Sequence, residues 1–408
     1  MSAADKTYPM LKADLIVSSS HLHGTGPEGA IIKDPVSNRY FSMSERVVSV
    51  LQLCDGTKNV QEIADAFNQS VLQPVSVEAV ERLIENMDKA GLFQSQQKQA
   101  TTPRNSNLAA LLRRLLFLKI KTFNPDRLLE KALRYVKPFF TVHFVVLATA
   151  LMLSAVCLLV FGLFNLRNTT MTAIRPSEIG IGWSLCFAIA ILHELAHGFA
   201  CKHWGGQVKS MGLLFLYFNP ALYCDVSDAW LFAKRSQRLW TMAAGAFFEG
   251  FIWAIIVWIG AFFPLSPGQQ RICTFMILFT GIKIIINLNP LIKLDGYYIL
   301  SDALSIPNLR SRSFRYSRQI LKKYLLRSGW AQQVSPKESI SFLLYCTLAG
   351  PFSLWLGATM FWRGVISIAA HHWRGGWILI AVLVVVALEP LLAYIGWVRQ
   401  QMLRKAEA

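Results

Sequence analysis

Long apolar runs separated by short polar stretches occupy most of the chain after residue 138. The runs cover residues 139–164, 180–202, 237–263, 271–291, 340–362 and 376–398. Each has at least the roughly 20 residues that a helix needs to cross the hydrocarbon core of a bilayer. The pattern predicts a mainly α-helical polytopic membrane protein with about six transmembrane helices. The membrane domain is expected at 139–398, with a core at about 180–300.

The N-terminal part of the chain, residues 1–97, has a different pattern with many more polar positions. Residues 15–43 alternate short apolar runs with glycine-rich turns, which is typical of short strands. Three helical patterns follow, at 42–56, 59–69 and 76–91, with apolar residues on one face of each. This order predicts a soluble α+β domain of winged-helix-like type.

A polar and then basic segment, residues 98–138, joins the two domains. Within it, residues 108–137 carry eight Lys and Arg residues in an amphipathic pattern. Such a segment is expected to lie on the membrane surface, where anionic lipid attracts it. The alternative is a solvated helical linker. The last residues, 399–408, are expected to form a basic cytoplasmic tail.

The distribution of charge favours a membrane protein over a nucleic-acid-binding protein. The chain has 41 Lys and Arg against 24 Asp and Glu, a net charge of +17, but charged residues make up only 16% of it. The usual share in soluble domains is about 25%. No basic stripe is interleaved with aromatic residues, as a nucleic-acid groove requires, so nucleic acid is not expected as a partner. Basic residues gather before the first apolar run and at 202–238 and 310–337, which predicts cytoplasmic N- and C-termini in a bacterial inner membrane.

The second apolar run contains a pattern of metal-binding residues, His193-Glu194-Leu195-Ala196-His197. On a helix, residues four positions apart share a face, so both imidazoles can reach one metal ion. Zinc suits two histidines and a carboxylate, with a fourth position left for water. Glu194 is then placed to take a proton from that water. The alternative is that these polar groups reach the membrane interface from the end of a helix, but ionisable residues within a span are costly and usually functional.

The fourth apolar run ends with Asp295, which is the candidate third zinc ligand. Asn289-Pro290 interrupts the run, and such a break is tolerated where the freed backbone lines a cavity. The break allows the chain to turn Asp295 toward the histidines. The alternative is a helix cap at the membrane interface. In the loop 218–238, Asp225 and Asp228 are candidates to hydrogen-bond a metal-binding histidine, and the alternative is that they are solvated loop acids.

The pair of motifs HELAH, at 193–197, and NPLIKLDG, at 289–296, resembles the site-2 protease family of intramembrane metalloproteases. The resemblance covers about residues 180–300. It implies that His193, His197 and Asp295 bind zinc and that Glu194 is catalytic, while Asn289 helps to hold the substrate. The chain departs from the family at Glu249, where members often have a Gly-Pro-x-x-Asn pattern and this chain has Gly-Ala-Phe-Phe-Glu. Glu249 is therefore expected either to have a polar role near the site or to pair with a basic residue.

Residues 11–94 resemble the PqqD family, which has a small peptide-binding winged-helix domain. The resemblance rests on KDPVSNRYFSMSE followed by LCDGTKNVQEIADAF. It implies capture of a precursor peptide as an added strand at a sheet edge. The expected edge includes Ile31, Ile32, Tyr40 and Phe41, and the alternative is that these residues belong to the core. The expected partners are a peptide or precursor substrate, membrane lipid, and export or peptide-modifying proteins.

Three hypotheses for the function follow. The first is a zinc endopeptidase that cleaves a peptide precursor or membrane-associated peptide captured by the N-terminal domain. The second is a non-proteolytic membrane component of a peptide maturation or export system. The third, a transporter that uses intramembrane acids, is disfavoured because the chain lacks halves with a repeated pattern.

Overall fold

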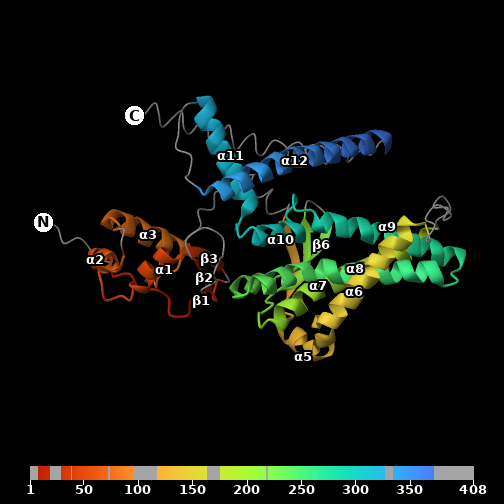
Figure 1. Ribbon diagram of the computed structural model, residues 1–408, viewed down its shortest axis with the longest axis horizontal. Coiled ribbons are helices and arrows are strands. Elements are labelled where there is room, and N and C mark those ends of the chain that lie inside the picture. Colours follow the sequence, from red (N-terminus) through yellow and green to blue (C-terminus); the bar gives the residue numbers. More distant parts are fainter. Residues whose placement is uncertain are drawn as a thin grey trace.

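The computed structural model describes residues 8–18, 29–37, 39–71, 74–94, 117–162, 175–216, 219–326 and 334–371. It is mostly helical, with a small N-terminal sheet and a second small sheet in the membrane domain (Figure 1). Five helices in these residues are long and apolar enough to cross a membrane.

The N-terminal domain consists of three strands followed by three helices. These are β1 (Ile16–Ser18), β2 (Gly29–Asp34), β3 (Arg39–Ser44), α1 (Glu45–Gln52), α2 (Val60–Ser70) and α3 (Val77–Ala90). The predicted order of strands and helices is confirmed, although α1 is shorter than its pattern suggested. Helix α3 begins after Ser76, whose side chain accepts a hydrogen bond from the N–H of Ala79. It ends at Gly91, where φ is +81°, a conformation that glycine adopts without steric cost.

The two faces of this sheet have different partners. On β2, Ala30 and Ile32 point toward the three helices and join a core with Phe67, whose exposed fraction is 1%. Because successive side chains on a strand alternate in direction, Ile31 and Lys33 lie on the opposite face. That face packs on the membrane domain.

The strand order corrects the predicted peptide-capture edge. The order is β1-β2-β3, so Ile31 and Ile32 lie in the middle strand, hydrogen-bonded on both sides. Alternation of apolar and polar residues identifies the two faces of a strand, but it does not identify the neighbouring strands. The prediction that Ile31 and Ile32 lie at an edge is therefore wrong. Tyr40 and Phe41 lie on β3, which pairs only with β2 within the described residues.

A second sheet, which the sequence analysis missed, lies in the membrane domain. It consists of β4 (Phe117–Phe123), β5 (Met211–Leu216) and β6 (Asn219–Cys224), with β5 in the middle. The basic segment therefore includes a strand before helix α5 (Asp126–Val136), so the alternative of a helical linker at 108–137 does not hold for 117–123. The expected loop at 218–238 likewise contains β6, the short helix η4 (Ser227–Leu231) and the start of the next span.

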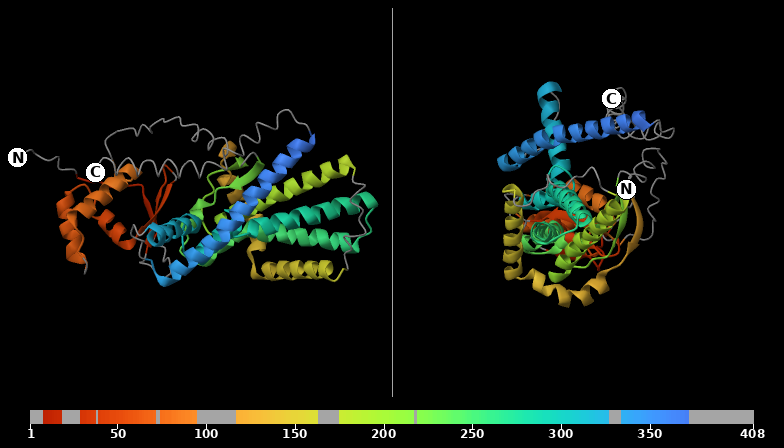
Figure 2. Two further views of the ribbon diagram at one scale, coloured as in Figure 1. Left: turned by 90° about the horizontal axis from the view of Figure 1, so that it is seen from above. Right: turned by 90° about the vertical axis from the view of Figure 1, so that its right-hand side faces the viewer.

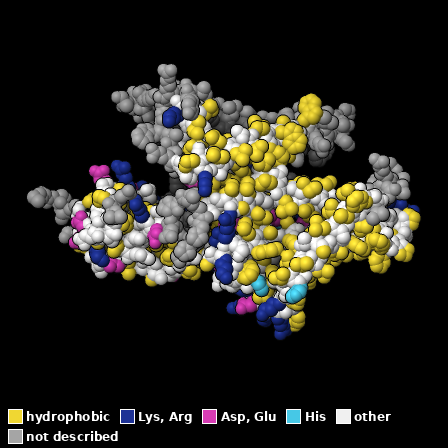
Figure 3. Space-filling model, viewed as in Figure 1, with side chains coloured by type: hydrophobic (Ala, Val, Ile, Leu, Met, Phe, Trp, Pro, Cys, Tyr) yellow, Lys and Arg dark blue, Asp and Glu magenta, His cyan; other side chains and the backbone are white. Residues whose placement is uncertain are grey.

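The candidate spans are α6 (Val142–Val160), α7 (Pro176–His203), α8 (Arg235–Phe262), α9 (Pro267–Leu288) and the first part of α12 (Pro336–His371). They match the first five apolar runs. The sixth run, 376–398, lies outside the described residues. Figure 3 shows hydrophobic side chains over the outer faces of these helices, as contact with lipid requires. The short helix η1 (Lys137–Phe140) leads into α6.

Two further helices follow the break after α9. They are α10 (Asp295–Ala303) and α11 (Leu309–Leu326), and α11 packs against α12. An ion pair between Arg238 Nε and Asp302 Oδ1, 2.8 Å long and almost fully buried, fixes α10 to the start of α8. This contact holds α10 against the core spans.

The N-terminal domain docks on the membrane domain through its sheet (Figures 1 and 2). Asp228 of η4 is the centre of this contact. Its Oδ1 lies 2.5 Å from Lys33 Nζ and also accepts a hydrogen bond from the Tyr40 hydroxyl. The Ser18 hydroxyl donates to the carbonyl of Leu231 at 2.9 Å. All three side chains of the N-terminal domain come from the face of the sheet opposite its core.

Candidate metal centre

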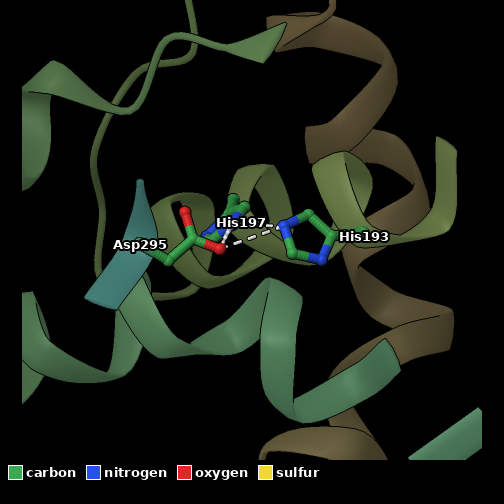
Figure 4. Close-up of side chains that lie close together, drawn as sticks. All are labelled: His193, His197 and Asp295. Carbon is green, nitrogen blue, oxygen red and sulfur yellow. Dashed lines mark hydrogen bonds and ion pairs between the residues drawn. The ribbon is translucent and has the colours of Figure 1, made fainter. Parts of the chain in front are cut away.

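Helix α7 brings His193 and His197 together. They lie one turn apart on one face of α7, and their Nε2 atoms are 3.2 Å apart (Figure 4). Both residues are buried, with exposed fractions of 3% and 6%. The spacing of the motif on a helix is sufficient to produce this arrangement.

Asp295 reaches the same point from the start of α10. Its Oδ2 lies 3.1 Å from His193 Nε2 and 3.5 Å from His197 Nε2. Helix α9 ends at Leu288, and the chain turns through Asn289 and Pro290 before α10 begins. Gly296 permits the turn to be tight, because a Cβ there would lie 2.1 Å from the carbonyl oxygen of Leu288.

Hydrogen bonds on the far side of each imidazole fix its tautomer. His197 Nδ1 lies 2.8 Å from the carbonyl oxygen of Thr241, which can only accept, so Nδ1 carries the proton. His193 Nδ1 lies 2.8 Å from Oε2 of Glu249, a carboxylate that also accepts. Both Nε2 atoms are thereby left with a lone pair that faces Asp295.

A glycine on α8 provides the space for this cluster. A Cβ on Gly245 would lie 2.3 Å from His197 Nε2 and 2.6 Å from His193 Nε2. Any side chain at this position would occupy the space in front of the two lone pairs. Gly245 and Glu249 are four residues apart, so one face of α8 both makes room for the histidines and orients one of them.

The cluster fits a bound cation. Three potential ligand atoms, the two Nε2 and Asp295 Oδ2, lie 3.1–3.5 Å apart. Asp295 Oδ2 is buried and has no hydrogen-bond partner in the described part of the chain. Ligands bound tetrahedrally to zinc at about 2.0–2.2 Å lie roughly 3.3–3.6 Å apart. The donor set and its dimensions therefore suit zinc with a fourth position open.

An ion pair inside the spans supports His193. The second carboxylate oxygen of Glu249, Oε1, lies 2.9 Å from Lys283 Nζ on α9, and the Glu249 side chain is only 1% exposed. Glu249 thus both hydrogen-bonds a histidine and pairs with a base. Sequence reasoning missed Lys283, although a lysine in an apolar run is itself a signal of function.

Glu194 lies one step around α7 from His193 and is half-buried. Among the described residues its carboxylate has no hydrogen-bond or ion-pair partner. It is therefore next to the candidate metal ligands without being held in a structural contact.

Other candidate residues lie elsewhere or have local contacts. The expectation that Asp225 and Asp228 support a histidine is wrong, because Asp225 bonds to Ser227 and Asp228 holds the N-terminal domain. Burial opposes the charge of Asp228, but hydrogen bonds from Lys33, Tyr40 and the N–H of Gln207 outweigh it and lower its pKa below the ordinary value. Asn289 Oδ1 accepts a hydrogen bond from the N–H of Leu291 at 2.9 Å and so stabilises the turn after α9.

Comparisons of the chain with protein-family models, curated proteins and solved structures found no match.

Proposed function

We propose that this protein is an intramembrane zinc endopeptidase of the site-2 protease type. The observation that carries the proposal is the convergence of His193, His197 and Asp295 at one point, with Glu194 beside them and Gly245 opposite. The residues come from α7, α8 and α10, so the cluster depends on the packing of the whole core. Intramembrane ionisable groups of this kind are seldom retained without a function.

Zinc, when bound by these three residues, supplies a Lewis acid and lowers the pKa of an attacking water. Glu194 takes the proton of the water as it attacks the peptide carbonyl, and then transfers it to the amine that leaves. Glu249 and the carbonyl of Thr241 hold the histidine tautomers during both steps.

An extended substrate has a matching surface in strand β6. This strand packs on α7 next to the site, because a Cβ on Gly198 would lie 3.4 Å from the sulfur of Cys224. Within the described residues β6 pairs only with β5, so its outer edge has unpaired backbone groups. A peptide added as a further strand satisfies those groups and presents its carbonyls in a regular row.

The N-terminal domain is proposed to be winged-helix-like and to capture the peptide. The free side of β3 is the available edge, with Tyr40 and Phe41 on it, in place of the edge first expected. Docking through Asp228 holds this edge close to α10, whose first residue is Asp295, and a tethered domain raises the local substrate concentration. The protein is proposed to lie in a bacterial inner membrane with its termini, and the zinc-binding end of α7, on the cytoplasmic side.

Metal dependence tests the proposal. The purified protein, in detergent, is incubated with a mixed-sequence peptide library, and new peptide termini are identified by mass spectrometry. We expect cleavage with one zinc per chain, loss of cleavage on removal of zinc by a chelator, and recovery with zinc but not with magnesium. His193→Ala is expected to bind little zinc and to be inactive. Cleavage by the metal-free protein would contradict the proposal.

The second hypothesis, a non-proteolytic component that binds peptide for maturation or export, is supported only by the free edge of β3. It predicts that peptide binding continues while no peptide is cleaved at any zinc concentration. The library experiment separates the two, because binding can be measured by the peptides that the protein retains.

A further inference from the structure

A large apolar pocket lies on the other side of α7 from the histidines. It has a volume of about 630 Å³ and is enclosed by η1, α6, α7 and α8. Its walls include Phe140, Val145, Phe199, Trp240 and Phe248. The walls continue into side chains on the outside of the spans, such as Val142, which is 75% exposed. The pocket therefore belongs to the part of the surface that faces lipid.

Basic residues border one end of the pocket. Lys137 lies between two wall residues, Val136 and Phe139, and Arg235 precedes the wall residue Ser236. Arg134 is one turn earlier on α5. Figure 3 shows Lys and Arg side chains gathered at the end of the molecule formed by α5.

These cations are not neutralised by nearby acids. Both acidic residues of α5, Asp126 and Glu130, pair with Lys202, at 3.1 and 3.7 Å. In the chain that the structure describes, neither Lys137 nor Arg235 has a carboxylate partner. The end of an apolar pocket thus carries unpaired, exposed positive charge.

A second tryptophan belongs to the walls. Trp204 lines the pocket together with Trp240, so two indole rings lie against whatever occupies it.

We propose that this pocket binds an anionic phospholipid, with an acyl chain between the aromatic walls and the phosphate at Arg134, Lys137 and Arg235. Apolar walls with unpaired cations at one end match the two parts of such a lipid. A transmembrane peptide helix fits less well. A helix about 10 Å wide fills roughly 400 Å³ per turn, so the pocket holds only about one and a half turns.

The pocket and the candidate metal centre share helix α7. The α7 wall of the pocket includes Leu192, Leu195 and Ala196, which alternate along the helix with His193 and His197. A bound lipid therefore packs against the back of the helix that carries both histidines. The proposal does not depend on proteolysis, since lipid binding is measured without substrate.

Fluorescence quenching by brominated lipid tests the proposal. The full-length protein is placed in maltoside micelles with dibrominated phosphatidylglycerol or dibrominated phosphatidylcholine at equal mole fractions. The pocket signal is the quenching of tryptophan fluorescence in the wild type minus the quenching in the double variant Trp204→Phe/Trp240→Phe, which lacks the two tryptophans of the pocket. We expect stronger quenching of this signal by phosphatidylglycerol, with half-saturation at a lower mole fraction than for phosphatidylcholine.

Two variants and their controls locate the site. The double variant Arg134→Gln/Lys137→Gln should bind phosphatidylglycerol more weakly, by about five-fold for each cation removed, which is equivalent to about 1 kcal/mol each. Its control is Arg82→Gln/Lys89→Gln, which makes the same change of charge on the exposed N-terminal helix α3.

Val145→Phe should fill the pocket and abolish the pocket signal. Its control, Val146→Phe, places the same ring on the 62% exposed neighbouring position and should have no effect. Equal quenching by the two lipids, or equal effects of Val145→Phe and Val146→Phe, would overturn the proposal. No quenching by either lipid would also overturn it, and would leave the pocket to a peptide helix.

Discussion

The substitution Gly245→Ala tests whether the space in front of the two histidines is needed for metal. Alanine is favoured over glycine in a helix by about 1 kcal/mol, so helix α8 itself should not be weakened. The added methyl group has no free space, however, because it points at the Nε2 atoms of His193 and His197.

The expected size of the effect follows from the distances. Ordinary contact with a Cβ begins at 3.4 Å, and the built Cβ lies 2.3 Å from His197 Nε2, so this nitrogen must retreat by about 1.1 Å. Zinc–ligand distances hold within about 0.2 Å. Because the shift is about five times that tolerance, we expect zinc affinity to fall at least about 100-fold, the upper end of the range for losing a supporting partner.

The assay measures zinc per chain by mass spectrometry after equilibration at a series of buffered free zinc concentrations, with thermal unfolding of the same samples. Gly180→Ala is the matched control, since it makes the same change on α7 with no atom within 4 Å of the new Cβ. It should bind zinc as the wild type does. If Gly245→Ala binds one zinc per chain with wild-type affinity, the metal does not lie where we place it.

Three other changes have defined outcomes. Glu249→Gln should weaken zinc binding about 10- to 100-fold without unfolding the protein, because His193 loses a carboxylate acceptor; unchanged affinity in a chelator competition would contradict this role. Asp228→Asn should weaken docking of the N-terminal domain by about 3–5 kcal/mol, because Lys33 is left buried without its charge partner, and hydrogen exchange in β1–β3 should rise. The pKa of Asp228 is lowered in the folded protein. The docking energy is therefore fully present above the pKa of Asp228 in the unfolded chain, about 3.9, and is lost as the pH falls through the lower pKa of the folded protein. Undocking that begins near neutral pH would be inconsistent with this contact. Gly296→Ala should lower both zinc content and thermal stability, since its Cβ would lie 2.1 Å from the carbonyl oxygen of Leu288, and a stable, zinc-replete variant would refute the tight turn.

The two histidines of the cluster could be placed together from sequence because their geometry is local, whereas the approach of Asp295 depends on the packing of α7, α9 and α10. His193 and His197 share a helical face by spacing alone, and Asp295 follows a helix break that proline signals. Lys283 could not be placed in the same way, because its contact with Glu249 depends on how α8 and α9 pack. The role of Gly245 could not be read from the sequence either, because the pattern marks the glycine but not the histidines that lie in front of it.

The differences between the predicted and the observed fold have a common physical cause. The segment 117–123 forms a strand because β5, about 90 residues later, supplies its hydrogen bonds, and no local pattern reports a distant partner. Ile31 and Ile32 were correctly expected in a strand, but its neighbours determine whether that strand is central. Asp228 has the composition of a solvated loop acid, and only the docking of the N-terminal domain gives it buried partners.

The most direct test of the central claim compares the zinc-loaded wild type with zinc-loaded Glu194→Gln in the peptide-library assay. Zinc content must be equal in the two samples, so that only the proton-transferring carboxylate differs. We predict one zinc per chain in both and a cleavage rate that is about 10²–10⁴-fold lower in the variant. Equal cleavage rates at equal zinc content would show that Glu194 does not act in the reaction, and would contradict the proposed zinc endopeptidase.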